Sequence, residues 1–476
     1  MLKTIILRFL IKVCHVTFNG LTCSQKAFIL LDLSKFKNGR YTMINTNFKE
    51  VQEEIIYSYE NTVFFRKHME QAGLAPSDIV EPKDFLRIPP TVKKNYRQNF
   101  PAGVIASGYN LKSPHVMRFQ SSGTEGDRLV SVVLSYDLAR RQASCISVNP
   151  NFSSLWKPGL KLRTCRFAAP NCSDVECANP NSTMDSRMLP DGTLVLPVYH
   201  DLLTTPDRMI NMALDEIEEY DPHLMFVDPT HFAFLIRAMK KLGRVPHKKE
   251  GFCIMSGYTL CTQVARRQIK ECFGENVAFA DMLGMSELGY LGFECPHGHQ
   301  HMNIDDYHLE FIHDGRAAQP GELAELLITT IDDKLSPHIR YATGDMFRLS
   351  EEACTCGDPT PVVRAEGRVK NALWRHDNTV VTPKELDELI GPAPWIDMYQ
   401  MNQTDDDQFT FKYLRNENWT QQAENELLEC FKDTLRSNNV TCSPTEYFPA
   451  DRGGKFISCI SSVAMREEKR RLLSWV

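Results

Sequence analysis

The alternation of helical periods with short β-rich runs, from Asn47 almost to the end of the chain, is the feature that most limits the fold. Apolar residues recur at three- and four-residue steps from Val51 to Val63 and from Phe232 to Leu242, which predicts helices that Gly73 and Gly243 can end. Strands are predicted at Leu224–Val227, Leu323–Ile331 and Phe409–Tyr413, the second of them buried because its apolar run is nearly continuous. The pattern predicts an α/β fold.

Two threonine-proline pairs predict where helices begin. Thr205-Pro206 and Thr382-Pro383 each place a capping oxygen before a proline at the first helical position. Glu385 completes a capping box for the second pair. A charged helix is predicted at Met465–Leu473, close to the end of the chain.

The chain has 476 residues, too many for one compact core, so it should divide into two or three parts. A loop rich in Cys, Gly and Pro precedes Gly367, which favours a large domain over residues 43–366 and a small α+β domain over residues 367–476. Residues 1–42 have three interpretations: an extension upstream of a true start at Met43, a disordered tail, or an amphipathic helix lying on a surface.

Composition excludes several classes of protein. A net charge of −6 argues against a nucleic-acid partner, which would need a basic surface. The fifteen cysteines are scattered and odd in number, so we expect reduced thiols rather than a disulfide framework. The apolar opening segment is interrupted by Arg8 and Lys12 and matches neither a signal peptide nor a membrane span. A cytoplasmic protein without a membrane partner is expected.

A loop rich in serine and glycine follows a predicted strand near Phe119. Its backbone N–H groups and hydroxyls are suited to cradle a polyphosphate, and the candidate residues are Ser121, Ser122, Gly123, Thr124 and Gly126. The loop lacks the Gly-Lys-Ser/Thr ending of a Walker motif, which argues against a mononucleotide kinase or a motor ATPase. Taken alone, such a segment is equally compatible with a plain turn.

Three further segments follow in a fixed order: Ser256-Gly257-Tyr258 within residues 256–260, Gly284-Met285-Ser286-Glu287, and Tyr341-Ala342-Thr343-Gly344-Asp345. In this order, with the loop before them, the chain resembles the adenylate-forming enzymes and, within them, the phenylacetate-CoA ligase branch. The resemblance extends from about residue 50 to about residue 455. It implies a large N-terminal adenylation domain followed by a small mobile lid, and an AMP-forming ligase that uses ATP and Mg²⁺.

The resemblance also implies roles for single residues. Glu287 would hold Mg²⁺ against the phosphates, because Mg²⁺ prefers hard carboxylate oxygens, and Ser286 would bond a phosphate oxygen. Asp345 would accept bonds from the ribose hydroxyls. Arg368 resembles the arginine that closes the nucleotide site, and Lys455, beside glycines 453 and 454, resembles the lid lysine that stabilises the charge developing at the α-phosphate.

A metal site is predicted on separate grounds. Cys295, His301, Cys354 and Cys356 offer four soft donors of the kind that tetrahedral Zn²⁺ prefers, and the phenylacetate-CoA ligase branch is similar at these places. With four protein ligands the zinc would be structural. His297 and His299 are competing ligands, and the alternative is a loop of free thiols with surface histidines.

The chain also departs from the family pattern. Leu283 stands where an aromatic residue usually faces the adenine, and Asp127 stands where a basic residue often follows the phosphate loop. Residues 370–378 lack the acidic hinge pair and the Arg-Gly turn that relatives use for thioester formation.

Three functions therefore compete: an acid-CoA ligase, an adenylating enzyme that passes its acyl group to an amine or a protein, and a nucleotide-binding protein without turnover. The substrate would be a small, aryl or medium-sized carboxylic acid, bound near Phe226, Asp228 and His231. The relatives make a homodimer a reasonable expectation.

Overall fold

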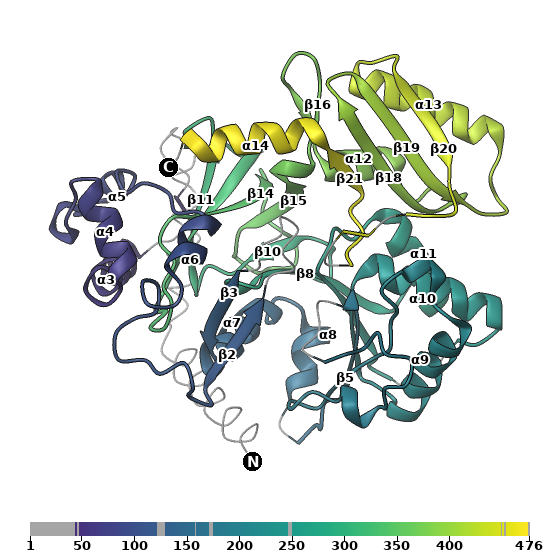
Figure 1. Cartoon of the computed structure of the whole chain (residues 1–476), viewed down its shortest axis with the longest axis horizontal. Helices are drawn as coiled ribbons and strands as arrows, with labels where there is room; N and C mark the ends of the chain where they lie inside the picture. Colours follow the sequence, from purple (N-terminus) through teal and green to yellow (C-terminus); the bar gives the residue numbers. More distant parts are fainter. Residues whose placement is uncertain are drawn as a thin grey trace.

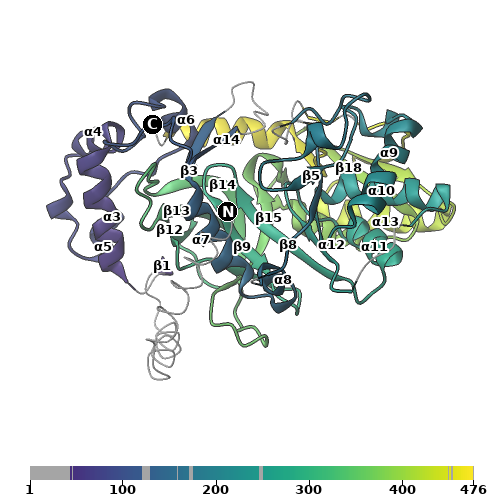
Figure 2. The same cartoon turned by 90° about the horizontal axis from the view of Figure 1, so that it is seen from below.

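The computed structural model describes residues 43–44, 47–120, 129–157, 159–170, 175–245, 250–448, 450–451 and 454–474. Residues 1–42, 45–46 and the phosphate loop at 121–128, and with them the expectations placed there, lie outside the described residues. Figure 1 shows the chain, and Figure 2 shows it turned by 90°. Among the described residues, none of the helices has the length and apolar character needed to cross a bilayer.

In the described chain, thirteen strands form one mixed sheet. Its main path is β1 (Met43–Ile44), β11 (Tyr307–His313), β13 (Ala324–Thr330), β14 (Tyr341–Leu349), β15 (Val362–Arg368), β10 (Gln300–Met302), β9 (Gly289–Glu294), β8 (Ala278–Met285), β7 (Cys253–Ser256), β6 (Leu224–Val227), β4 (Thr164–Phe167) and β5 (Thr193–Val195), with β12 (Arg316–Ala317) beside β11. From β5 to β8 the strands pair in parallel, and from β8 onward they pair antiparallel. The strand pairing in the sheet therefore changes from parallel to antiparallel at β8.

Three smaller sheets accompany it in the described part of the chain. They are the pair β2 (Val116–Gln120) and β3 (Val130–Leu134), the pair β16 (Leu373–Trp374) and β17 (Val380–Val381), and the four-stranded sheet of β20 (Val440–Pro444), β19 (Gln408–Arg415), β18 (Ile396–Asp405) and β21 (Cys459–Ser461). The four-stranded sheet has its own apolar core, built from Phe411, Tyr413 and Phe431 among others. A separate C-terminal sheet agrees with the expected small α+β unit.

The α-helices are α3 (Phe48–Asn61), α4 (Val63–Gln71), α5 (Pro82–Phe85), α6 (Lys93–Asn99), α7 (Ser135–Ile146), α8 (Pro150–Ser153), α9 (Asp207–Tyr220), α10 (Pro229–Leu242), α11 (Gln263–Phe273), α12 (Pro383–Ile390), α13 (Gln421–Leu435) and α14 (Ser462–Ser474). Short 3-10 turns lie at Pro76–Asp78, Ser154–Trp156, Asp185–Arg187, Leu202–Thr204 and Val369–Asn371. Both views place α3, α4 and α5 at one end of the molecule and α9, α10 and α11 at the other.

Most of the predicted elements are confirmed, with two corrections. The first predicted helix is two helices, because the chain is extended at Thr62, and Val63 is half exposed rather than part of a buried stripe. At Thr205-Pro206 the helix begins one residue later, and the Thr205 hydroxyl donates to the carbonyl of Leu202 instead of capping the helix. Thr382 and Glu385 do form the expected capping box.

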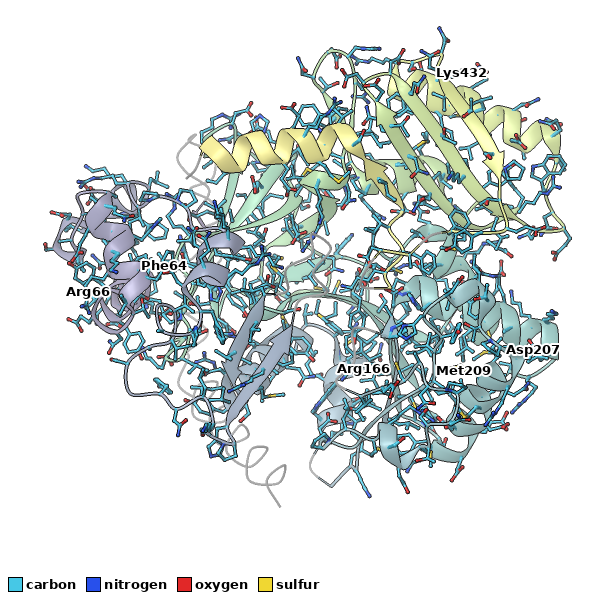
Figure 3. The ribbon with its side chains drawn as sticks, in the orientation of Figure 1. Phe64, Arg66, Arg166, Asp207, Met209 and Lys432 are labelled. Carbon is cyan, nitrogen blue, oxygen red and sulfur yellow. The ribbon has the colours of Figure 1, made fainter. Side chains whose placement is uncertain are left out.

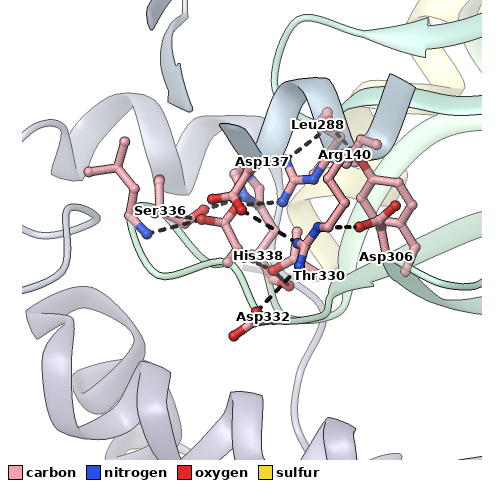
Figure 4. Close-up of polar contacts among 12 residues, drawn as sticks. Asp137, Arg140, Leu288, Asp306, Thr330, Asp332, Ser336 and His338 are labelled. Carbon is pink, nitrogen blue, oxygen red and sulfur yellow. Dashed lines mark hydrogen bonds and ion pairs between the residues drawn. The ribbon is translucent and has the colours of Figure 1, made fainter. Parts of the chain in front are cut away.

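A buried ionic network joins α7 to the loop between β13 and β14. The Arg141 guanidinium is fully buried and donates from Nη2 to Asp333 Oδ2 at 2.8 Å and from Nη1 to the carbonyl of Leu288 at 3.1 Å. Its neighbour Arg140 lies within ion-pair distance of Asp306, at 2.9 Å, and of Asp137 and Asp332, as Figure 4 shows. Because Leu288 directly follows Glu287, this network supports the turn that carries the proposed Mg²⁺ ligand.

Candidate active site

One cavity of about 2170 Å³ opens where the sheet changes from parallel to antiparallel pairing. Its walls include most of the nucleotide-site residues expected from the sequence and described in the structure: Tyr258, Gly284, Met285, Ser286, Glu287, Asp345, Arg368 and Lys455. Ser256 and Gly257 lie just behind the wall, where both are buried. Segments separated by almost 200 residues therefore meet around a single space.

Glu287 lies in the tight turn between β8 and β9. Gly284, in β8 just before the turn, is closely packed: a Cβ there would lie 2.7 Å from the Met282 sulfur and 3.0 Å from the carbonyl oxygen of Gly289. The Glu287 carboxylate is buried and accepts a hydrogen bond from the Tyr341 hydroxyl at 3.3 Å. Burial alone would raise the pKa of Glu287, but the Lys93 ammonium beside it lowers that pKa below its ordinary value. The carboxylate is thus kept ionised, as a metal ligand must be.

Lys93, which the sequence analysis did not single out, is the cation beside Glu287. Its Nζ lies 2.9 Å from Glu287 Oε1, and both residues line the cavity. Two backbone bonds bring α6 to this place: the Thr91 N–H donates to the carbonyl of Arg340 at 2.9 Å, and the Ala342 N–H donates to the carbonyl of Thr91 at 2.8 Å. In the sequence Lys93 is one of two adjacent lysines that open a short helix, and such residues are usually solvated.

Asp345 and Arg368 form a second ion pair on the cavity wall. They are cross-strand partners on β14 and β15, and Arg368 Nε lies 3.1 Å from Asp345 Oδ1. About a quarter of the Asp345 side chain is exposed, so its carboxylate reaches the cavity surface. Burial raises the pKa of Asp345, and Arg368 opposes this shift. The pair can present one carboxylate and one guanidinium to a nucleotide.

Lys455 reaches the cavity from the C-terminal part of the chain. Its Nζ donates to the carbonyl of Tyr258 at 3.3 Å and lies 5.8 Å from the centre of the Tyr258 ring. The Asp451 carboxylate accepts from the Lys455 backbone N–H at 2.8 Å and so closes the turn that presents the lysine. The Tyr258 ring stacks on Phe226, with ring centres 4.8 Å apart. Lys455 therefore lies over the wall made by residues 256–260.

Two residues expected near the acid substrate have structural contacts instead. Asp228 is fully buried, caps α10 by accepting from the N–H groups of Thr230 and His231, and accepts from the Thr259 hydroxyl at 3.1 Å. His231 is buried beside it. Burial would raise the pKa of Asp228, but the His231 side chain holds that pKa below its ordinary value. Among the expected pocket residues, Phe226 does line the cavity.

The four expected soft donors meet in space. One ligand atom from each of Cys295, His301, Cys354 and Cys356 lies within 4.8 Å of the others. Cys295 Sγ lies 3.7 Å from Cys354 Sγ, and His301 Nε2 lies 3.4 Å from Cys356 Sγ. Tetrahedral zinc with its usual bond lengths requires about 3.8 Å between two sulfurs and about 3.5 Å between sulfur and nitrogen. The donor set therefore fits zinc.

The competing histidines are outside this set. His299 Nδ1 is 3.1 Å from Cys354 Sγ, but His299 is exposed, and His297 Nδ1 contacts the Thr355 hydroxyl at 2.8 Å. The ring of His301 is held from its other side, because its Nδ1 lies 3.0 Å from the Thr360 hydroxyl. Such an outer contact orients a metal-binding imidazole.

Comparison with known proteins supports the expected resemblance. The chain is 25% identical over 352 residues to the phenylacetate-coenzyme A ligase of Thermus thermophilus, covering 71% of this chain and 73% of that protein. It is 24% identical over 360 residues to the corresponding ligase of Aromatoleum evansii, with the same coverage. A crystal structure of 2-hydroxyisobutyryl-CoA ligase in the postadenylation state, in complex with R3-HIB-AMP, matches 90% of this chain and 91% of its own, with a TM-score of 0.65 and 16% identity. A scan of family models gave no match.

Proposed function

We propose that this chain, a member of the phenylacetate-CoA ligase-like branch of the adenylate-forming enzymes, activates a small carboxylic acid with ATP and transfers the acyl group to CoA. The observation that carries the proposal is the meeting of Glu287, Asp345, Arg368 and Lys455 around one cavity. We take residues 43–366 as the adenylation domain and residues 367–476 as the lid, a division supported by the separate C-terminal sheet.

The first half-reaction follows from the charges on the cavity wall. A carboxylate oxygen of the acid attacks the α-phosphorus of ATP, the bond to the bridging oxygen breaks, and pyrophosphate leaves with that electron pair. Attack brings two anions together, so the Lys455 ammonium stabilises the charge that develops between them. Asp345 and Arg368 would hold the ribose and the phosphate end of the nucleotide. A Mg²⁺ ion held by Glu287 would supply further neutralisation of the phosphates.

Each of the two carboxylates on the cavity wall is paired with a cation. Lys93 lies against Glu287 and Arg368 lies against Asp345, so each carboxylate has a cation where the proposal places a metal ion or a ribose. Glu287 would hold the Mg²⁺ ion, and Lys93, which lines the same cavity, would offer its ammonium to the phosphates. The lowered pKa of Glu287 supports a Mg²⁺ site there, because an ionised carboxylate is the form that binds the metal.

Acid-dependent exchange of labelled pyrophosphate into ATP tests the first half-reaction directly. Exchange with at least one acid from an aryl, hydroxyaryl, amino and fatty acid panel is expected. Blank exchange with every acid, together with measurable ATP binding, would instead favour a nucleotide-binding protein without turnover. Adding CoA, hydroxylamine or an amine to the exchanging mixture then identifies the acceptor, and formation of an acyl-amine without thioester would contradict transfer to CoA.

Replacing Glu287 with glutamine should raise the Mg²⁺ concentration needed for half-maximal exchange by about tenfold or more, because even outer partners of metal ligands contribute 10- to 100-fold to affinity. The measurement is a Mg²⁺ titration of the exchange rate at saturating ATP. Glu53→Gln, on the exposed face of α3, serves as the matched control. An unchanged Mg²⁺ requirement would rule out Glu287 as the ligand.

We also propose that the cluster of Cys295, His301, Cys354 and Cys356 binds structural zinc. Purified protein should carry about one equivalent of zinc, since four protein ligands complete a tetrahedral site. The Cys354→Ser variant should lose most of that zinc and unfold at a lower temperature, whereas Cys430→Ser, at an exposed free thiol, should change neither. Less than about a tenth of an equivalent in the unaltered protein, prepared without chelator, would contradict the assignment.

A further inference from the structure

Gln142 and Tyr290 form a hydrogen-bonded pair on the cavity wall. The Gln142 amide nitrogen, from α7, donates to the Tyr290 hydroxyl oxygen, from β9, at 3.1 Å, and both residues line the cavity. In the described part of the chain, neither the amide oxygen of Gln142 nor the hydroxyl proton of Tyr290 has a protein partner. Burial raises the pKa of Tyr290 to about 12, so the hydroxyl keeps its proton at neutral pH. The pair therefore presents a donor and an acceptor to the cavity.

This property is the same in both orientations of the Gln142 amide. With the amide nitrogen bonded to the hydroxyl oxygen, the Tyr290 proton is the donor and the amide oxygen is the acceptor. With the amide turned over, the hydroxyl donates to the amide oxygen, which leaves the amide N–H groups as donors and the hydroxyl oxygen as acceptor. A ligand group that both donates and accepts hydrogen bonds suits the pair in either case.

The surroundings of the pair are largely apolar. Phe226, Met282 and the Tyr290 ring line the cavity and pack against one apolar cluster. Ile146, one helical turn after Gln142 on α7, belongs to that cluster and also lines the cavity. A wholly apolar ligand would cover the donor and the acceptor of the pair without replacing their hydrogen bonds to water, which costs free energy.

Two charged groups in the same part of the cavity have opposite signs. Arg166 and Asp191 both line the cavity, and after burial their charges act on the pKa of Tyr290 in opposite directions. The Asp191 carboxylate accepts from the Thr193 N–H at 2.9 Å and from the Thr193 hydroxyl at 3.0 Å. Figure 3 places Arg166 on the inner side of the parallel strands, with Met209 in the helical layer outside them. Because the two charges oppose each other, this wall favours a neutral polar group over an anion or a cation.

A series of contacts connects the pair to the reacting end of the cavity. Lys455 donates to the carbonyl of Tyr258, and the Tyr258 ring stacks on Phe226. Phe226 and the Tyr290 ring pack against the same apolar cluster. An acid whose carboxylate is at Lys455 would therefore lay its body along Phe226 and direct its far end toward Gln142 and Tyr290.

We propose that the preferred acid carries a neutral hydroxyl group at the end remote from the activated carboxylate, and that Gln142 and Tyr290 recognise this group together. The inference rests on the proposed adenylation and narrows its substrate class. A hydroxyl donates one hydrogen bond and accepts others, so it satisfies both the acceptor and the donor of the pair. A site built to bond a hydroxyl discriminates against an analogue without one, because the polar groups of the site are then left unpaired.

The test compares acids that differ only at the remote end. Pyrophosphate exchange is measured with benzoate, phenylacetate and 3-phenylpropanoate, which differ in length, each bare and with a hydroxyl, methyl or carboxyl group at ring position 3 or 4. On the framework that fits the cavity, we expect the hydroxy acid to exceed its methyl counterpart in kcat/KM by about tenfold or more. The methyl acids are the matched controls, since a methyl group fills a similar volume without hydrogen bonds.

Two variants assign the preference to the pair. Tyr290→Phe keeps the packing of the ring and removes only its hydroxyl, and Gln142→Leu removes the amide. Each should abolish most of the preference for hydroxyl over methyl, with an unchanged KM for ATP. A role confined to folding would lower the rates with all acids by the same factor and leave this ratio unchanged. Tyr447→Phe, at a tyrosine that is more than half exposed and does not line the cavity, is the control variant.

Three outcomes would overturn the inference while leaving the adenylation proposal in place. They are a methyl or bare acid that equals or exceeds the hydroxy acid on every framework, a preference for the carboxy acids, and a hydroxyl preference that both variants retain. If exchange is blank with all acids, the proposed function fails, and calorimetric titration of the same acids in the presence of AMP decides the role of the pair. Absent binding, or a preference that is the same in the variants and the unaltered protein, would then refute it.

Discussion

Replacing Lys455 with alanine should lower the rate of acyl-AMP formation by about 10²–10³-fold, the usual loss when one preorganised donor is removed from a developing charge. Lys455 lies over the cavity wall with its Nζ 3.3 Å from the Tyr258 carbonyl, and the Asp451 turn fixes its backbone. ATP affinity should change little, because the proposed role concerns the transition state rather than the bound nucleotide. Pyrophosphate exchange and nucleotide binding, measured separately, check the two statements.

Lys94→Ala is the matched control for that variant, since Lys94 is exposed on α6 and does not line the cavity. A second control is conversion of chemically prepared acyl-AMP to thioester. The Lys455→Ala enzyme should retain this step, because the α-phosphate is no longer attacked in it. A loss of less than about threefold in exchange, well below the effect of one removed donor, would show that Lys455 does not act on the α-phosphate.

Local signals predicted much of the fold. α12 has a capping threonine, a proline at its first position and a glutamate three residues after the threonine, and all three agree on where the helix begins. The break at Thr62 carried no such signal, because the apolar period continues across it and only tertiary packing shows that Val63 is half exposed. Where several local preferences agree, the sequence is sufficient. Where a tertiary packing contact determines the boundary of an element, the sequence alone is not sufficient.

Some residues of the candidate site could likewise be predicted from local sequence motifs, and others could not. Gly284 and Glu287 lie in one short motif, and Asp345 and Arg368 lie in two others. The spacing of glycines and charged residues within each motif is visible in the sequence. Lys93 could not be found that way, since it becomes part of the site only through the backbone bonds between Thr91 and the distant residues Arg340 and Ala342. The four candidate metal ligands were recognisable because four soft donors in two short segments are rare, although the distance between the segments had no local signature.

Replacing Arg141 with methionine should destabilise the protein by about 3–5 kcal/mol, because Asp333 would then be buried without its partner. Burial alone would raise the pKa of Asp333, but Arg141 lowers that pKa below its ordinary value. Nearby, burial and then Asp333 raise the pKa of Glu54 to about 8, so Glu54 adds little charge at neutral pH. Asp333 is therefore the group left uncompensated. Urea unfolding at neutral pH measures the loss.

The pH dependence separates this charge effect from lost packing. A carboxyl whose pKa is depressed on folding contributes stability above its unfolded pKa of about 3.9 and loses that contribution as pH falls further. In Arg141→Met the pKa of Asp333 should rise, so the stability gap to the unaltered protein should narrow as the pH is lowered from 7 toward 4. The Arg141→Met/Asp333→Asn double variant should lose less than the sum of the single losses. Additive losses and a stability gap that stays constant with pH would mean that the charge of Arg141 does not stabilise Asp333, and that Arg141 contributes only its packing and its hydrogen bond to the Leu288 carbonyl.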